Sequence, residues 1–453
     1  MKIIITGCGK IGTTITSCLA SEGHDLVCID DDAEVVNEIV NIYDVMGVCG
    51  NGADSDTLTE AGVESAELFI AVTGSDELNM LSCFIARRMG AKHTIARIRN
   101  PEYNDEKGLG LMRRELRLSM AINPDLMAAK ELENILKFPS AVNVEIFSGR
   151  NFEMVQIRLK PNSALDGMSL SEMRKKYDAK FLVCVVQRED EVFIPDGSFV
   201  LKSGDKIGLT ASPSEIQKLL KMLGILQKQA RNVMILGASR TAFYLAKRLL
   251  LVGNTVKIIE KDKQKCAEFS NLLPGAMVIC GDGASQELLL EEGLETTDAF
   301  VALTGMDEEN ILISIFASTK NVPKVIAKVN RNELASMAED LGLDCIVSPK
   351  KIISDIVTRY ARALENTIGS NVENLYKIMD GKAEVLEFSV QSDFEYVNIP
   401  LKDMHLKSNI LIAGILRGKK IIIPAGDDVI MPGDNVIVLA AGGRMQDLLD
   451  IIK

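Results

Sequence analysis

The chain repeats one sequence pattern about 230 positions apart, and this repeat constrains its fold more than any other feature. In the first copy, an apolar run over 2–6 leads into a glycine-rich loop at 7–12, and the next apolar run ends at Asp30. In the second copy, a run over 232–236 leads into a related loop at 237–242, and the run after it ends at Glu260. Self-similarity at a fixed spacing indicates a duplicated structural unit.

Both copies alternate short apolar runs with helical stretches, which predicts β-α-β units around a buried parallel sheet. Each copy ends with a strand, a proline (Pro124 or Pro349) and an amphipathic helix. The strands that follow are shorter and more closely spaced, and a turn pattern of Pro, Gly and Gly-Asp recurs at 195–205 and 424–434. The fold prediction is α/β, with two Rossmann-like parallel-sheet domains, each followed by a small α+β domain. The expected domains are residues 1–140, 141–227, 228–370 and 371–453.

Composition excludes several classes of protein. The formal net charge of −12 argues against a nucleic-acid surface, which needs basic residues. No apolar run approaches the roughly 20 residues that span a bilayer, and the N-terminus begins on a strand rather than on a secretory signal. The nine cysteines form no C-x-x-C pair. We therefore expect a reduced, cytoplasmic protein without a metal site.

The first glycine loop has the context of a dinucleotide-binding fingerprint: a strand before it, an apolar helix after it and an acid closing the next strand. Its second glycine, Gly9, would let the backbone approach a pyrophosphate, and phosphate would bind the free N–H groups of the helix N-terminus. Lys10 would add a cation there or simply be solvated. Asp30 would accept hydrogen bonds from ribose hydroxyls and repel a 2′-phosphate, which favours NAD(H) or an adenine nucleotide over NADP(H).

Later strands of the first copy supply further candidates. Asn51 lies in a Gly-Asn-Gly turn that would pass the adenine, with a plain turn as the alternative. Thr73 and Gly74 follow the fourth strand at the edge where open α/β sheets bind ligands, although the next two residues would serve as a helix cap. Arg97 stands in an apolar strand, and a buried guanidinium needs an anion, either a ligand phosphate or a structural carboxylate.

The second loop departs from the glycine pattern, because Ser239 and Ala242 replace two glycines and would crowd a pyrophosphate. Glu260 keeps the acid, Asp282 lies in the following turn, and Lys328 stands where Arg97 stands in the first copy. The second copy is therefore either a weaker or different nucleotide site or an empty structural copy.

A constellation for catalysis is missing from the sequence. Hydride transfer needs an acid–base group opposite the nicotinamide. The three histidines occupy no repeat-related positions, and neither a Ser-His-Asp nor an H-E-x-x-H arrangement occurs. We therefore predict binding without catalysis, so no enzyme. The alternatives are an NAD-dependent oxidoreductase with duplicated Rossmann domains and a scaffold whose units no longer bind nucleotide.

At these motifs the chain resembles the regulators of Trk-type potassium uptake, which are built from tandem RCK (regulator of potassium conductance) units. The resemblance covers essentially the whole chain. It implies a cytoplasmic, nucleotide-sensing subunit at the inner face of the membrane that gates a separate membrane potassium transporter in response to NAD(H) or ATP/ADP. The expected assembly is a homo-oligomeric ring, with a tetramer as the expected size. The resemblance also carries nucleotide contacts onto both copies. The candidate cofactor-binding residues are Gly7, Cys8, Gly9, Lys10, Ile11, Gly12, Asp30, Asn51, Thr73, Gly74, Arg97, Gly237, Ala238, Ser239, Arg240, Thr241, Glu260 and Asp282.

Overall fold

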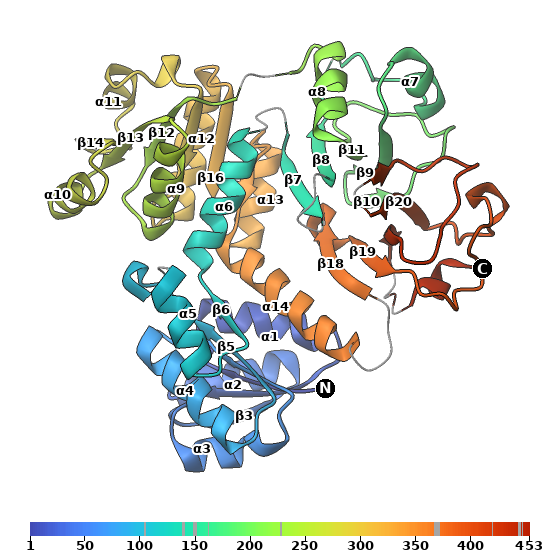
Figure 1. Cartoon of the computed structure of the whole chain (residues 1–453). Helices are drawn as coiled ribbons and strands as arrows, with labels where there is room; N and C mark the ends of the chain where they lie inside the picture. Colours follow the sequence, from blue (N-terminus) through green and yellow to red (C-terminus); the bar gives the residue numbers. More distant parts are fainter. Residues whose placement is uncertain are drawn as a thin grey trace.

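The structure is a computed structural model of the whole chain (Figure 1). It describes all residues except 104–105, 138–140, 148–151, 162, 227–228, 367–371, 419, 443–444 and 446. Of the residues at the three domain junctions expected from the sequence, 140, 227, 228, 370 and 371 lie outside the described residues.

The first Rossmann-like unit is a six-stranded parallel sheet in the order β3-β2-β1-β4-β5-β6. Both faces of the sheet are covered by helices, so its central strands are almost continuously apolar and buried. The strands are β1 (Lys2–Thr6), β2 (Asp25–Asp30), β3 (Met46–Cys49), β4 (Leu68–Ala71), β5 (His93–Arg97) and β6 (Met120–Ile122). The helices are α1 (Lys10–Ser21), α2 (Ala33–Tyr43), α3 (Ser55–Glu60), α4 (Asp76–Met89), α5 (Glu106–Glu115) and α6 (Pro124–Lys137).

The second unit repeats this topology strand for strand, in the order β14-β13-β12-β15-β16-β17. Its strands are β12 (Asn232–Leu236), β13 (Thr255–Glu260), β14 (Met277–Cys280), β15 (Ala299–Ala302), β16 (Lys324–Lys328) and β17 (Ile346–Val347). Its helices are α9 (Arg240–Leu251), α10 (Lys263–Leu272), α11 (Gln286–Glu291), α12 (Asp307–Thr319), α13 (Asn332–Asp340) and α14 (Pro349–Asn366). The strand order reverses between β1 and β4 and between β12 and β15, which is where such sheets bind ligands.

Each unit is followed by a five-stranded antiparallel sheet, and the fold class expected from the sequence is confirmed. The first of these sheets contains β7 (Asn143–Phe147), β8 (Phe152–Arg158), β9 (Leu182–Arg188), β10 (Glu191–Phe193) and β11 (Lys206–Ala211), with α7 (Leu170–Lys176) and α8 (Pro213–Met222). The second contains β18 (Val372–Ile378), β19 (Ala383–Ser389), β20 (Ile410–Arg417), β21 (Lys420–Ile422) and β22 (Asn435–Ala441). Strands β7 and β18 were not predicted. They complete equivalent sheets, β7-β8-β11-β9-β10 and β18-β19-β22-β20-β21.

The two small domains pack on each other through their sheets. One apolar cluster joins Met154 and Val185 of the first small domain to Val385 and Leu439 of the second. The Thr210 hydroxyl donates to the Ala413 carbonyl across the same contact, at 3.2 Å. The small domains therefore tie the two halves of the chain together away from the Rossmann sheets (Figure 1).

The helices that follow β6 and β17 are exchanged between the units. Helix α6, of the first unit, packs on α9 of the second, while α14, of the second unit, packs on α1 of the first (Figure 1). Apolar residues carry both contacts: Leu132 and Ile135 join the core of the second unit, and Ile353 and Val357 join that of the first. Each Rossmann-like unit is therefore completed by a helix from the other. No helix among the described residues is both long and apolar enough to cross a membrane.

Candidate functional site: a cavity between two glycine loops

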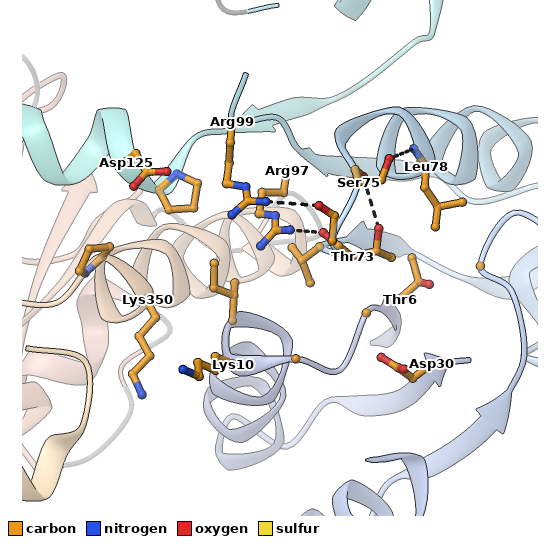
Figure 2. Close-up of a pocket in the computed structure, with 18 of the residues that line it drawn as sticks. Thr6, Lys10, Asp30, Thr73, Ser75, Leu78, Arg97, Arg99, Asp125 and Lys350 are labelled. Atoms are coloured by element: carbon orange, nitrogen blue, oxygen red, sulfur yellow. Dashed lines mark hydrogen bonds between the residues drawn. The ribbon is translucent and has the colours of Figure 1, made fainter. Parts of the chain in front are cut away.

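A cavity of about 840 Å³ opens at the carboxyl edge of the first sheet and reaches the second unit. Its walls include the glycine loop, Asp30 and the ends of β4 and β5 (Figure 2). The second unit contributes residues from the start of α9, the end of β16 and the start of α14. These are Thr241, Lys328, Asn330, Pro349 and Lys350. The first site is therefore built by both halves of the chain.

The N-terminus of α1 is left open toward this cavity. Gly9 is the N-cap residue, and no side chain caps the helix. A Cβ built at Gly9 would meet no atom within 4 Å, so the space above the loop is free. Gly7 has φ +93°, and a Cβ at Gly12 would lie 1.9 Å from the Gly7 carbonyl oxygen. Gly7 and Gly12 thus shape the turn, whereas Gly9 leaves room for a ligand at free helical N–H groups.

Asp30 ends β2 beside the same loop. One carboxylate oxygen accepts from the Cys8 backbone N–H at 2.6 Å, and the other accepts from the Asp32 N–H at 3.2 Å. An ionised carboxylate has about four acceptor positions, so both oxygens keep capacity for hydroxyl donors. The side chain is half-buried and lines the cavity. Asp30 is therefore held in place by the loop and still able to accept hydrogen bonds from a ribose.

A buried asparagine fixes the ends of β4 and β5. The Asn79 side-chain oxygen accepts from the Thr73 N–H at 2.7 Å and hydroxyl at 2.8 Å, while its amide donates to the Arg97 carbonyl at 3.0 Å. Asn310 makes the same contacts with Thr304 and Lys328 in the second unit. The duplication thus extends to individual hydrogen bonds, and it places Arg97 and Lys328 at equivalent points.

Arg97 is a buried cation aimed into the cavity. Its side chain donates to the Thr73 carbonyl, and its Nε has no hydrogen-bond partner among the described residues (Figure 2). Burial, followed by the neighbouring charge of Arg99, lowers the pKa of Arg97 to about 10. Asp76 and Asp125 offset this only at longer range. Of the two partners considered for Arg97, a structural carboxylate is not found in ion-pair contact within the described part of the chain, which leaves a ligand phosphate as the other candidate.

Side chains bind the start of α9 in the second unit, unlike the start of α1 in the first. The Ser239 hydroxyl accepts from the Ala242 N–H at 3.3 Å and caps α9. Glu260 repeats the contacts of Asp30, since its oxygens accept from the Ala238 N–H at 2.7 Å and the Asp262 N–H at 2.9 Å. The Thr241 hydroxyl donates to Asp125 of α6 at 2.8 Å. Glu260 thus keeps the geometry of Asp30, but the N-terminus of α9 is capped by a side chain, whereas that of α1 is not.

The cavity collects most of the candidates from the first copy and one from the second. Those that line it are Gly7, Gly9, Lys10, Ile11, Asp30, Asn51, Thr73, Gly74, Arg97 and Thr241. Cys8 is buried and contributes its backbone, and Gly12 packs under the turn. Gly237, Ala238, Ser239, Arg240, Glu260 and Asp282 do not line this cavity.

Several residues of the cavity were missed. Arg99 lies two residues beyond Arg97, past the end of β5, and strand periodicity gave no signal for it. Asp125 and Lys350 directly follow the two prolines that mark the repeat. Their proximity to the glycine loops depends on the exchange of α6 and α14, for which the sequence offered no signal.

Two duplicated Rossmann-like units with one open dinucleotide cradle define the class: a tandem nucleotide-binding protein. The family model described as the TrkA-N domain matches residues 3–124 and 233–349, and that of the TrkA-C domain matches 154–224 and 385–453. A Trk system potassium uptake protein TrkA homolog of Archaeoglobus fulgidus is 32% identical over 453 residues, covering 100% of both chains. The chain belongs to the TrkA family.

Solved structures agree on the fold. The RCK domain of GsuK and the GsuK channel bound to NAD each match with a TM-score of 0.62 at 17% identity. Each match covers 97% of this chain, and they cover 92% and 76% of those chains, respectively. The resemblance to tandem RCK units drawn from the sequence is confirmed at the level of the fold.

Proposed function

We propose that this chain is the nucleotide-sensing regulatory subunit of a Trk-type potassium uptake system, with NAD(H) or ATP/ADP as its effector. The observation that carries the proposal is the open N-terminus of α1 facing the buried Arg97, whose Nε has no hydrogen-bond partner among the described residues, across the cavity. Phosphate would bind the N–H groups following Gly9, and a ribose would bind Asp30. Membership of the TrkA family and the NAD-bound relative of the same fold support this.

Nucleotide binding would act by linkage rather than catalysis. The cavity walls come from both units, and α14 runs from the cavity to the second small domain (Figure 1). A ligand shifts an equilibrium only by its differential affinity for the two states. A nucleotide that contacts both units would therefore favour one arrangement of them, and a ring of such subunits at the inner face of the membrane would pass this to a potassium transporter.

Calorimetric titration of the chain with NADH, NAD, ATP and ADP tests the proposal. We expect binding in the wild type, at least a tenfold loss in Asp30→Ala, and much weaker binding of NADPH than of NADH. Glu260→Ala is the matched control, because Glu260 has the same backbone contacts in the second unit. No binding by the wild type, or turnover of bound NADH with a carbonyl substrate, would contradict the proposal. Potassium flux through a reconstituted transporter, measured with and without nucleotide, would then show whether nucleotide binding raises or lowers transport.

The two loop glycines make a second prediction. Gly9→Val should remove nucleotide binding at unchanged stability, because the residue has φ −68° and ψ −172° and its Cβ would point into empty space. Gly12→Ala should instead destabilise the protein by at least about 2 kcal/mol, because overpacking against a rigid backbone is costly. Thermal denaturation and titration with ADP measure both effects. If Gly9→Val binds ADP normally, the phosphate position is wrong.

A further inference from the structure

The exchanged helices α6 and α14 begin alike but carry opposite charges. Both start with proline, and the second residue is Asp125 in α6 and Lys350 in α14. Because the helices are exchanged, each begins beside the glycine loop of the other unit. The aspartate of the first unit therefore lies at the loop of the second, and the lysine of the second unit lies at the loop of the first.

Asp125 is bound at the N-terminus of α9. Its Oδ1 accepts from the hydroxyl of Thr241, the second residue of that helix, at 2.8 Å, and Thr241 is 1% exposed. The residue equivalent to Thr241 in α1 is Ile11, whose side chain has no hydrogen-bond donor. Ser239 satisfies a further N–H of α9 with its own hydroxyl. The second cradle thus contains a carboxylate and a side-chain cap where an anionic ligand would bind, and the positive end of a helix favours this charge.

The first cradle has the opposite character. It lacks a side-chain cap, and Lys10 and Lys350 both line the cavity beside it. Figure 2 shows the two lysines extending on the same side of the glycine loop, with Arg97 and Arg99 at the end of β5. Asp125 lies farther along the same cavity, toward the second unit. Both units keep an acid and a basic residue at equivalent positions, and they differ in the helix that reaches the loop: Lys350 lies beside the open loop, whereas Asp125 is bound at the other.

We propose that Asp125 is a resident anion that takes the place of a nucleotide phosphate in the second unit, and that Lys350 completes the phosphate site of the first. The inference rests on the proposed function and specifies it: each chain binds one nucleotide, at the first unit. A phosphate entering the second cradle would have to displace Asp125 from Thr241 and would face its negative charge. The loss of two glycines in the second loop and the negative charge of Asp125 would then both disfavour nucleotide binding in the second unit.

The test is the stoichiometry of ADP and NADH binding to the full chain by calorimetry. The wild type should bind one nucleotide. The double variant Asp125→Lys, Ser239→Gly gives the second cradle the lysine and the uncapped helix N-terminus of the first and should bind two, with the second lost on adding Glu260→Ala. Lys350→Asp alone should weaken binding at the first unit at least tenfold, whereas Lys351→Asp, on the same helix but outside the cavity, should not.

Each failure has a distinct meaning. Two nucleotides per wild-type chain would overturn the role of Asp125 and leave the proposed function standing. One nucleotide in the double variant, together with unchanged affinity in Lys350→Asp, would also overturn the inference. If the wild type binds neither ADP nor NADH, the proposed function and the role of Lys350 are both contradicted, and a site that the double variant gains and that needs Glu260 would support the role of Asp125 alone.

Discussion

Replacing Arg362 with methionine should destabilise the protein by about 3–5 kcal/mol, because it removes the cation shared by two carboxylates and leaves Glu22 with Lys377. Arg362 lies in α14 and is 7% exposed. It donates to Glu22, at the C-terminal end of α1, at 2.6 Å from both Nε and Nη2. It also donates to Glu384 of the second small domain at 3.0 and 2.9 Å. One guanidinium thus joins the first unit, the exchanged helix and the second small domain.

Urea denaturation followed by circular dichroism measures this loss. Lys92→Met is the control, because Lys92 pairs with Glu67 at 2.8 Å but its side chain is 65% exposed. An exposed pair contributes at most about 1 kcal/mol. A loss in Arg362→Met no larger than in Lys92→Met would show that the buried cluster does not hold the parts together.

The same cluster predicts a pH dependence. Burial alone would raise the pKa of Glu22, but hydrogen bonds and charges from Lys377 and Arg362 outweigh it and hold the pKa below its ordinary value. The stabilisation is therefore complete above the ordinary carboxyl pKa and is lost as the pH falls through the lowered native value. The stability difference between the wild type and Arg362→Met should narrow in that acidic range.

The sequence was sufficient for what local periodicity and repetition encode. Alternating apolar runs predicted the parallel sheet, and the spacing of Gly7, Asp30 and Thr73 predicted candidate ligand contacts at its carboxyl edge, because all three lie at strand ends on that edge. Arg97 reaches the same edge because it is the last residue of β5, which runs parallel to β4. The family to which these motifs pointed is the one that the comparisons show.

The exchange of helices could not be predicted in the same way. Helices α6 and α14 each present an amphipathic face that would fit either unit, and the choice depends on contacts between residues more than 100 positions apart, such as Thr241 with Asp125. Local pattern carries no information about that choice. For the same reason β7 and β18 were missed: each lies at a sheet edge, where pairing with β8 or β19 rather than its own periodicity defines the strand.

Replacing Arg97 with methionine should weaken nucleotide binding about 100-fold and, at the same time, make the nucleotide-free protein more stable. Arg97 is 7% exposed, and its lowered pKa of about 10 means that the charged form is disfavoured in the folded state. A base with a lowered native pKa opposes folding at neutral pH, and this opposition is relieved only as the pH rises through the native value. Removing the charge should therefore raise the free energy of unfolding by roughly 1–3 kcal/mol, and the loss of the hydrogen bond to Thr73 should reduce this gain.

Urea denaturation and titration with ADP on the same preparations separate the two effects. Arg97→Lys is the matched control, because the chain itself carries a lysine, Lys328, at the equivalent position of the second unit. Arg97→Lys should keep much of the affinity for ADP and should show little of the stability that is gained in Arg97→Met. A structural arginine would behave in the opposite way, with stability lost and ADP binding unchanged in Arg97→Met. A ligand-free protein stabilised by losing its buried cation would show that Arg97 is kept at this position for an anion that the chain itself does not supply.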